Sequence, residues 1–193
     1  GQWQTENALQ QLTTTSENAE TAIPERLAAC EGLALMGSEP ARQQLNAVAA
    51  DTTQPTVLRK HSAALLTGLD PGTGAKVTAA LLSTMKLEEH PEDLARSFLA
   101  VRNGSTVLAK TLAGVTLDSA VAREILRVVR ESGLAAPELE AALKTSGKIT
   151  SRKTINDEER LALLTLSNHS ASAAEGEQVY RNEKLGCLKC HAI

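Results

Sequence analysis

Hydrophobic residues recur along most of this chain at intervals of three and four positions, which is the spacing of one face of an amphipathic helix. Two stripes of this kind run through residues 58–69 and 121–129. No stretch alternates convincingly between apolar and polar residues for more than four positions, so the pattern of a half-buried β-strand is missing. We therefore expect an all-α fold with almost no strand.

Turn and cap signals separate these helical stretches every 10 to 20 residues. The sequence Ser-Glu-Pro at 38–40 places a capping hydroxyl and an early proline before an apolar stretch. His-Pro-Glu-Asp at 90–93 and Asn-Asp-Glu-Glu at 156–159 place acids in a first turn, where the helix dipole stabilises negative charge. Each of these signals predicts the start of a separate helix.

The predicted helices pair into a loose repeat of roughly 30 to 36 residues. First helices are expected near 24–36, 56–69, 91–103 and 118–131, and each is followed by a second helix, near 40–50, 74–86, 105–113 and 137–146. Helix pairs bury their apolar faces by stacking on one another, and the pattern over residues 20–147 resembles degenerate HEAT-type repeats. We expect a HEAT-like α-solenoid, with a compact bundle of the same helices as the alternative.

After the last predicted pair the pattern changes. Residues 145–154 are polar and predict a loop. Two further helices are expected near 156–167 and 172–182, with a short linker at 168–172 between them.

Composition supports helices and excludes several classes of protein. Hydrophobic residues make up 42% of the chain but aromatic residues only 2%, so the core is built from Leu, Ala and Val. The net charge of −3 and the pI of about 5.9 argue against a nucleic-acid partner. Arg123, Arg127 and Arg130 share a helical face, but Glu124 and Glu131 stand close by, so we expect a solvated face. No run of 18 apolar residues exists, so no membrane span is expected.

The strongest chemical signal is the sequence Cys187-x-x-Cys190-His191. Two thiols at this spacing can bond to the two vinyl groups on one edge of a haem, and the adjacent imidazole can then bind the iron. The same three side chains could instead bind zinc, with His169 or a neighbouring chain as the fourth ligand. The tail could also carry no ligand, or a disulfide between the two cysteines. The third cysteine, Cys30, lies in a helical run and is expected to be a small buried residue.

The sequence around the motif resembles the opening of a small soluble cytochrome c. Residues 174–180 contain Gly176 and Tyr180 at the spacing of the helix that precedes the motif in that family. Residues 186–193 then carry the motif, with Ile193 where the family often has an apolar residue. The resemblance implies that Cys187 and Cys190 bind haem c covalently and that His191 is an axial ligand.

The order of the two parts resembles the large multidomain haem-binding proteins of planctomycetes and verrucomicrobia. In those proteins a propeller-type domain assigned as a dehydrogenase precedes the repeats. The resemblance implies electron transfer, a periplasmic or cell-envelope location, and a dehydrogenase domain or redox protein as partner. Catalysis is expected in a domain outside this chain, which we do not expect to be an enzyme itself.

The expected division is a HEAT-like repeat domain at 1–168 and the N-terminal fragment of a c-type cytochrome domain at 172–193. The family's second axial ligand, usually Met, follows the motif by tens of residues, whereas the sequence stops two residues after His191. We therefore expect a truncated domain without a closed haem site. Met36 and Met85 precede the motif and are expected in the helical core. The first residues show no signal-peptide pattern, so the location is inferred from the motif alone.

Two functional hypotheses follow. In the first, the chain is an electron-transfer segment whose repeats act as scaffold, spacer and docking surface for the haem domain. In the second, the repeats are a protein-binding scaffold with no redox role, and the motif is unused or binds zinc. His61 and His90 have no mutual spacing that suggests a site, and we expect them at the surface or at helix caps.

Overall fold

The computed structural model describes residues 2–150, 155–170 and 172–182. These residues form helices joined by turns and loops, and no β-strand occurs among them, which confirms the expected all-α class. None of the helices in the described ranges is long and apolar enough to cross a membrane.

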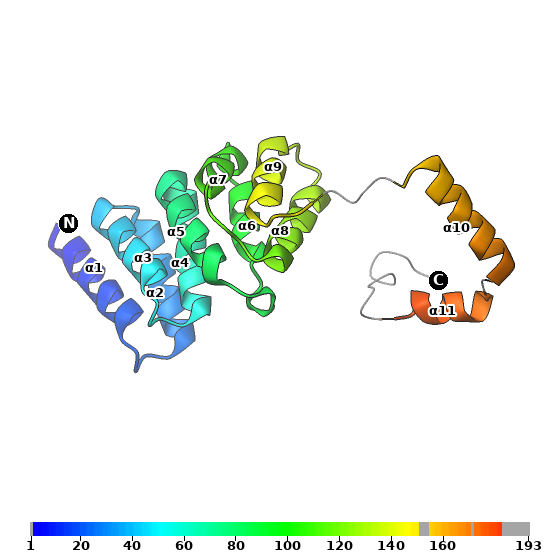
Figure 1. Ribbon diagram of the computed structural model, residues 1–193. Helices are drawn as coiled ribbons and strands as arrows, with labels where there is room; N and C mark the ends of the chain where they lie inside the picture. The colour runs from blue at the N-terminus through cyan, green and yellow to red at the C-terminus, as the bar shows by residue number, and fades with distance from the viewer. Residues whose placement is uncertain (1, 151–154, 171, 183–193) are drawn as a thin grey trace. The chain divides into compact units, whose positions relative to one another are not determined.

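The elements follow one another in pairs along the chain (Figure 1). They are α1 (Gln2–Glu17), α2 (Ile23–Met36), α3 (Glu39–Ala50), α4 (Thr56–Leu69), α5 (Pro71–Thr84), the 3₁₀ turn η1 (Leu87–Glu89), α6 (Glu92–Leu99), α7 (Gly104–Leu112), α8 (Ser119–Glu131), α9 (Pro137–Ser146), α10 (Asp157–Ser170) and α11 (Ala173–Tyr180).

Most boundaries lie close to the expected ones, and the differences have local causes. Helix α5 begins at Pro71, earlier than expected, because the Asp70 carboxylate accepts hydrogen bonds from two first-turn N–H groups and Pro71 takes the first helical position. Helix α6 ends at Leu99, before the expected 103, and the chain then turns through Asn103, whose φ is 60°, into α7. Helix α10 continues into the expected linker, and α1 was not expected at all.

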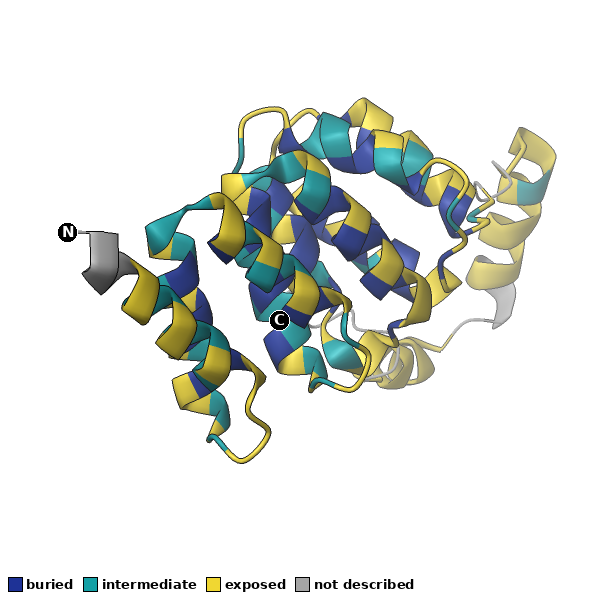
Figure 2. Ribbon diagram, turned by 90° about the vertical axis from the view of Figure 1, so that its left-hand side faces the viewer, coloured by how far each residue is buried: buried dark blue, intermediate teal, exposed yellow. Residues whose placement is uncertain are grey.

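Helices α1 to α9 pack in two rows (Figure 1). Helices α2, α4, α6 and α8 lie side by side in one row, and α1, α3, α5, α7 and α9 lie in the other. Consecutive helices alternate between the two rows, and each helix also contacts the next helix of its own row, as α7 contacts α9. The buried faces of both rows point toward each other, so that one continuous core runs between them (Figure 2).

Near the start of the second helices α3, α5 and α7, one small residue lies where the two helices of the pair meet. Ala41 in α3 is fully buried, and Gly74 and Gly104 follow it at intervals of 33 and 30 residues. A Cβ atom on Gly74 would lie 2.7 Å from the Thr67 Cα, and one on Gly104 would lie 2.2 Å from the Phe98 carbonyl oxygen. The repeat length read from the sequence therefore recurs in the packing.

Arginines near the start of α2 and α4 cap the C-terminal ends of the preceding helices, α1 and α3. The Nε and Nη2 atoms of Arg26 donate to the Ser16 carbonyl oxygen at 3.0 and 2.9 Å, and the Arg59 Nε donates to the Ala49 carbonyl oxygen at 3.2 Å. Both carbonyls lie at helix C-termini, where a positive charge is stabilised by the helix dipole. Arg26 is only 2% exposed, which is rare for arginine unless its donors are paired. Arg26 and Arg59 stand 33 residues apart, which is again the repeat length.

Contacts divide the chain into two compact units, at residues 1–150 and 151–193. The second unit contains α10 and α11, whose described side chains are nearly all exposed. The sequence analysis placed the division between 168 and 172. Contacts within the structure do not test where a cytochrome domain begins. The predicted division between 168 and 172 therefore stays a prediction.

Candidate functional site

The three residues expected to bind haem, Cys187, Cys190 and His191, lie outside the described residues. The structure describes the chain as far as Asn182, which includes the helix that leads toward the motif. The site can therefore be built only from α11 and from what the other helices provide.

Local interactions stabilise both ends of helix α11. The Ser172 hydroxyl caps its start by accepting from the Glu175 N–H at 3.4 Å. An ion pair between Arg181 Nε and Glu177 Oε1, 2.8 Å apart, spans its last turn. A Cβ atom on Gly176 would meet no atom within 4 Å, so the space beside this glycine is open. Among the described residues, no atom therefore packs against the Gly176 position of α11.

Of the two histidines of the first unit, His90 lies at the surface as expected, whereas His61 is half-buried within α4. His90 is exposed, ends η1 with a left-handed backbone, and its Nδ1 lies 3.1 Å from Glu92 Oε1. His61 lies on α4, half-buried, with its Nε2 3.4 Å from Glu31 Oε1. That distance makes a loose ion pair rather than a full hydrogen bond. Within the described residues no three His, Cys, Asp or Glu side chains form a group that could hold a metal ion.

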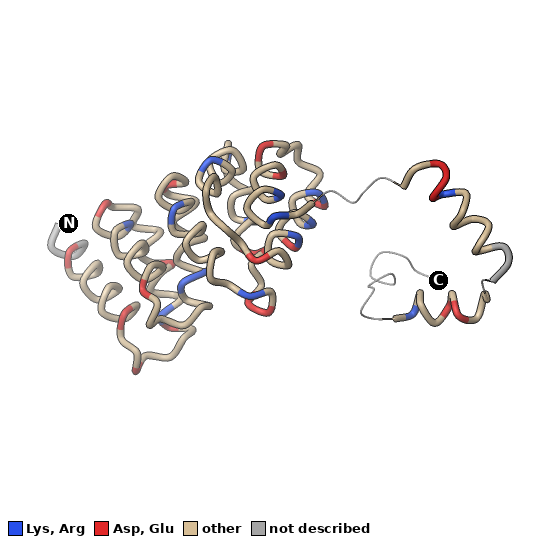
Figure 3. The backbone as a smooth tube through the Cα atoms, viewed as in Figure 1, with Lys and Arg blue, Asp and Glu red and all other residues tan. Residues whose placement is uncertain are grey.

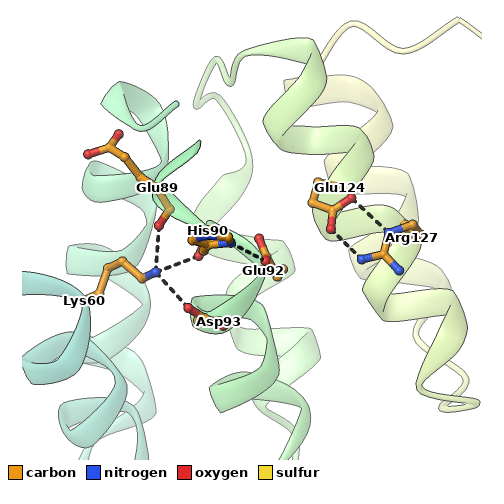
Figure 4. A network of polar contacts seen from close by, with 7 residues as sticks. All are labelled: Lys60, Glu89, His90, Glu92, Asp93, Glu124 and Arg127. Atoms are coloured by element: carbon orange, nitrogen blue, oxygen red, sulfur yellow. Dashed lines mark hydrogen bonds and ion pairs between the residues drawn. The ribbon is translucent and has the colours of Figure 1, made fainter. Parts of the chain in front are cut away.

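A polar network joins α4 to η1 and α6 (Figure 4). The Lys60 ammonium donates to the carbonyl oxygens of Glu89 and His90 at 2.7 and 2.8 Å and to Asp93 Oδ2 at 2.8 Å. Its three donors are thus all used, two of them on the C-terminal end of η1. We assign the network to the connection between neighbouring helix pairs, because Lys60 is fully engaged in structural bonds.

Glu89 stabilises the same 3₁₀ turn, η1, through its side chain. Its carboxylate accepts from the Lys86 N–H at 2.7 Å and from the Thr56 hydroxyl at 2.9 Å. These hydrogen bonds to the ionised form hold the pKa of Glu89 below its usual range. A carboxylate with a lowered pKa is a poor general base near neutral pH, which argues against a catalytic role for Glu89.

The arginine face of α8 is solvated and ion-paired, as expected. Arg127 bonds Glu124 through Nη2 and Oε1 at 2.5 Å and also bonds Glu131. Arg130 reaches Glu140 of α9 at 3.1 Å. These pairs raise the pKa of the Arg127 guanidinium. Positive and negative side chains are interspersed over the helices rather than separated (Figure 3), which does not suit nucleic-acid binding.

Cys30 and the two methionines belong to the core of the first unit. Cys30 is fully buried, the Ser62 hydroxyl donates to its sulfur at 3.4 Å, and burial raises the pKa of its thiol. Met85 is buried and Met36 packs against the same core. The expectation that these three residues are structural is confirmed.

The structure also assigns roles that the sequence analysis did not consider. Arg26, Arg59 and Lys60 cap helices and turns of neighbouring pairs. Their recurrence at the start of consecutive first helices was the available signal, but charge alone does not distinguish a capping cation from a solvated one.

No protein-family model matches this chain, and neither does any curated protein or solved structure.

Proposed function

We propose that this chain is an electron-transfer segment of a multidomain c-type haem protein. Cys187 and Cys190 form the thioether bonds and His191 is one axial ligand. The observation that carries the proposal is the sequence Cys187-x-x-Cys190-His191 directly after a helix that contains Gly176 and Tyr180.

The donor set fits haem c by its chemistry. Two thiols three positions apart are suited to the two vinyl groups, and a histidine next to the second thiol is suited to the iron. Bound haem supplies one-electron redox chemistry. Met36 and Met85 are engaged in the core of the first unit, so a second axial ligand has to come from elsewhere.

We further propose that helices α1 to α9 form a HEAT-like α-solenoid that acts as scaffold and docking surface for the haem domain. Support comes from the two rows of helices, the small residues at Ala41, Gly74 and Gly104, and the capping arginines at one repeat distance. Each pair contacts mainly its neighbours, which is the defining property of a repeat array. A periplasmic or cell-envelope location and a dehydrogenase or redox partner belong to the same proposal.

The test is covalent haem attachment. The full-length parent protein, which carries the whole of the proposed haem domain, is exported from a host with c-type maturation machinery, and its intact mass and reduced absorption spectrum are recorded. We expect a mass gain of one haem per chain, lost when Cys187 and Cys190 are both changed to alanine. Cys30→Ala is the matched control, because Cys30 is buried and should leave attachment intact.

A full-length parent that gains no mass under conditions that mature a known cytochrome contradicts the electron-transfer proposal. The alternative function is then a protein-binding scaffold, supported by the two rows of stacked helices. The zinc content of the purified chain and of its His191→Ala variant would show whether the motif binds zinc.

A further inference from the structure

Three lysines form a ladder across the row that contains α5, α7 and α9, whose helices lie side by side (Figure 1). Lys76, Lys110 and Lys144 follow one another at intervals of 34 residues. They are the sixth, seventh and eighth residues of their helices, and each lies on the exposed face of its helix. The axes of packed helices are about 8–10 Å apart, so successive lysines are spaced by about 10 Å across the row.

The first two lysines of the ladder are not neutralised by neighbouring acids. Among the described residues, no hydrogen bond or ion pair involves the side chain of Lys76 or Lys110, and α5 and α7 contain no Asp or Glu. Lys144 differs, because its Nζ lies 3.7 Å from Glu140 Oε2 on the same helix. The uncompensated positive charge of this row therefore lies on α5 and α7.

The surface around these two lysines is built from small side chains. Ala80 and Ser83 share the exposed face of α5 with Lys76, and the exposed Ala113 follows the last turn of α7. Short side chains leave the helix surface shallow, so a partner can approach it closely while the longer lysine side chains reach the partner's polar groups.

We propose that α5 and α7 bind a partner protein through an acidic amphipathic helix that lies across this row. In an α-helix, residues seven positions apart lie on the same side and about 10.5 Å apart along the axis, which matches the spacing of the lysines. Carboxylates at seven-residue intervals then face Lys76 and Lys110, with a smaller gain at Lys144. The surface is separate from the cysteine motif and does not depend on haem attachment.

The backbone of the row favours a helix over an extended segment. An extended peptide is commonly held by main-chain hydrogen bonds to the edge of a sheet, and no β-strand occurs in the part of the chain that the structure describes. A helix satisfies its own backbone groups and needs none from the surface. A nucleic acid is disfavoured, because two uncompensated lysines on a chain with a net charge of −3 are too few to neutralise a phosphate backbone.

The test is titration of the full chain with synthetic helical peptides, followed by its amide NMR signals with reductant present. The probe is a peptide of about 21 residues, rich in alanine and glutamine, with three glutamates seven residues apart. The control peptide has the same composition, with its glutamates four residues apart. We expect a Kd on the order of 100 μM for the probe, about threefold or more tighter than for the control, with shifts concentrated in α5 and α7.

Charge reversal identifies the residues involved. Lys76→Glu and Lys110→Glu should each weaken binding of the probe about fivefold, and together more than about tenfold. The matched control is Arg123→Glu, the same change at an exposed cation of α8 in the other row, which should alter the Kd less than about twofold. Lys144→Glu should have less effect than Lys110→Glu, because Glu140 already pairs with Lys144.

Circular dichroism melts show whether each variant is folded. The double variant Lys76→Gln with Lys110→Gln removes both charges without adding acids, and it should weaken binding in the same direction. Equal affinity for the two peptides, unchanged binding by the double variants, or equal loss in Arg123→Glu overturns the proposal. Affinity should fall severalfold when salt rises from about 0.05 to about 0.5 M, and an affinity independent of salt overturns it too. A single-stranded DNA that binds more tightly than the probe would assign the ladder to nucleic acid instead.

Discussion

The two units of this chain are both helical, yet among the described residues only those of the first unit form a hydrophobic core. Each of helices α2 to α9 buries side chains between the two rows, and Leu33, Leu66 and Leu108 are fully buried there. In the described part of the second unit, no apolar side chain of α10 or α11 is buried. The comparison shows that a helical pattern and a stable helix are different things, because tertiary burial supplies most of a helix's stability.

Truncation of one apolar side chain should have the largest effect on the free energy of unfolding, and this effect should differ strongly between the two units. Phe98, the only phenylalanine, is fully buried, and Phe98→Ala should lower the free energy of unfolding by about 3–5 kcal/mol through lost burial and a residual cavity. Leu163→Ala on α10 should change it by less than about 0.5 kcal/mol. Urea unfolding followed by circular dichroism, at a concentration where the chain is monomeric, checks both. Similar losses in the two variants would show that α10 belongs to the same cooperative unit.

A glycine-to-alanine substitution should have the next largest effect. It should destabilise the first unit but favour the helix in the second. Gly104→Ala places a Cβ within 2.2 Å of the Phe98 carbonyl oxygen, so the α6–α7 pair must separate, at a cost of about 1–3 kcal/mol. Gly176→Ala on α11 meets open space and should raise local helicity, since alanine favours helix over glycine by about 1 kcal/mol. Thermal unfolding measures the first change and far-UV circular dichroism the second. A Gly104→Ala protein as stable as the parent would contradict the close packing at this pair.

The smallest effect concerns helix caps and pH. The Thr73 hydroxyl and N–H donate to Asp70 and hold the pKa of its carboxyl below the usual range. Because the folded pKa is the lower one, its stabilisation is present above the unfolded value of about 3.9 and is lost as pH falls through the folded value. Asp70→Ala should cost about 1 kcal/mol at neutral pH, whereas Ser172→Ala, the cap of α11, should leave global unfolding unchanged.

Urea unfolding of the parent and Asp70→Ala between pH 7 and the acid limit measures that difference. The gap between the two proteins should close at low pH. A gap that stays constant would mean that the Asp70 side chain stabilises α5 by packing rather than by its charged hydrogen bonds.

The succession of helices was largely predictable from the sequence, because apolar spacing and cap residues act locally. The Ser38 cap of α3 and the proline starts of α2, α3 and α9 are signals of this kind. Helix α1 escaped prediction because it is rich in Gln and Thr and has weak periodicity. The end of α6 was placed too late because it depends on the contact between Gly104 and Phe98, which no local pattern reveals.

The candidate site was predicted from the motif Cys187-x-x-Cys190-His191 alone, and these residues lie outside the described part of the chain. The roles of Arg26 and Lys60 could not be predicted, since a capping cation is recognised only by the carbonyl groups that it reaches. The metal-binding and redox assignments therefore remain proposals.

The sequence by itself determined the all-α class, the order of the helices, the absence of a basic face and the position of the cysteine motif. These properties depend on residue type and on spacing along the chain. Only the tertiary structure decided that the helices lie in two rows and that Gly74 and Gly104 are contact points between helices. Those features arise from contacts between residues far apart in sequence, and such contacts are decided by packing in three dimensions rather than by local preference.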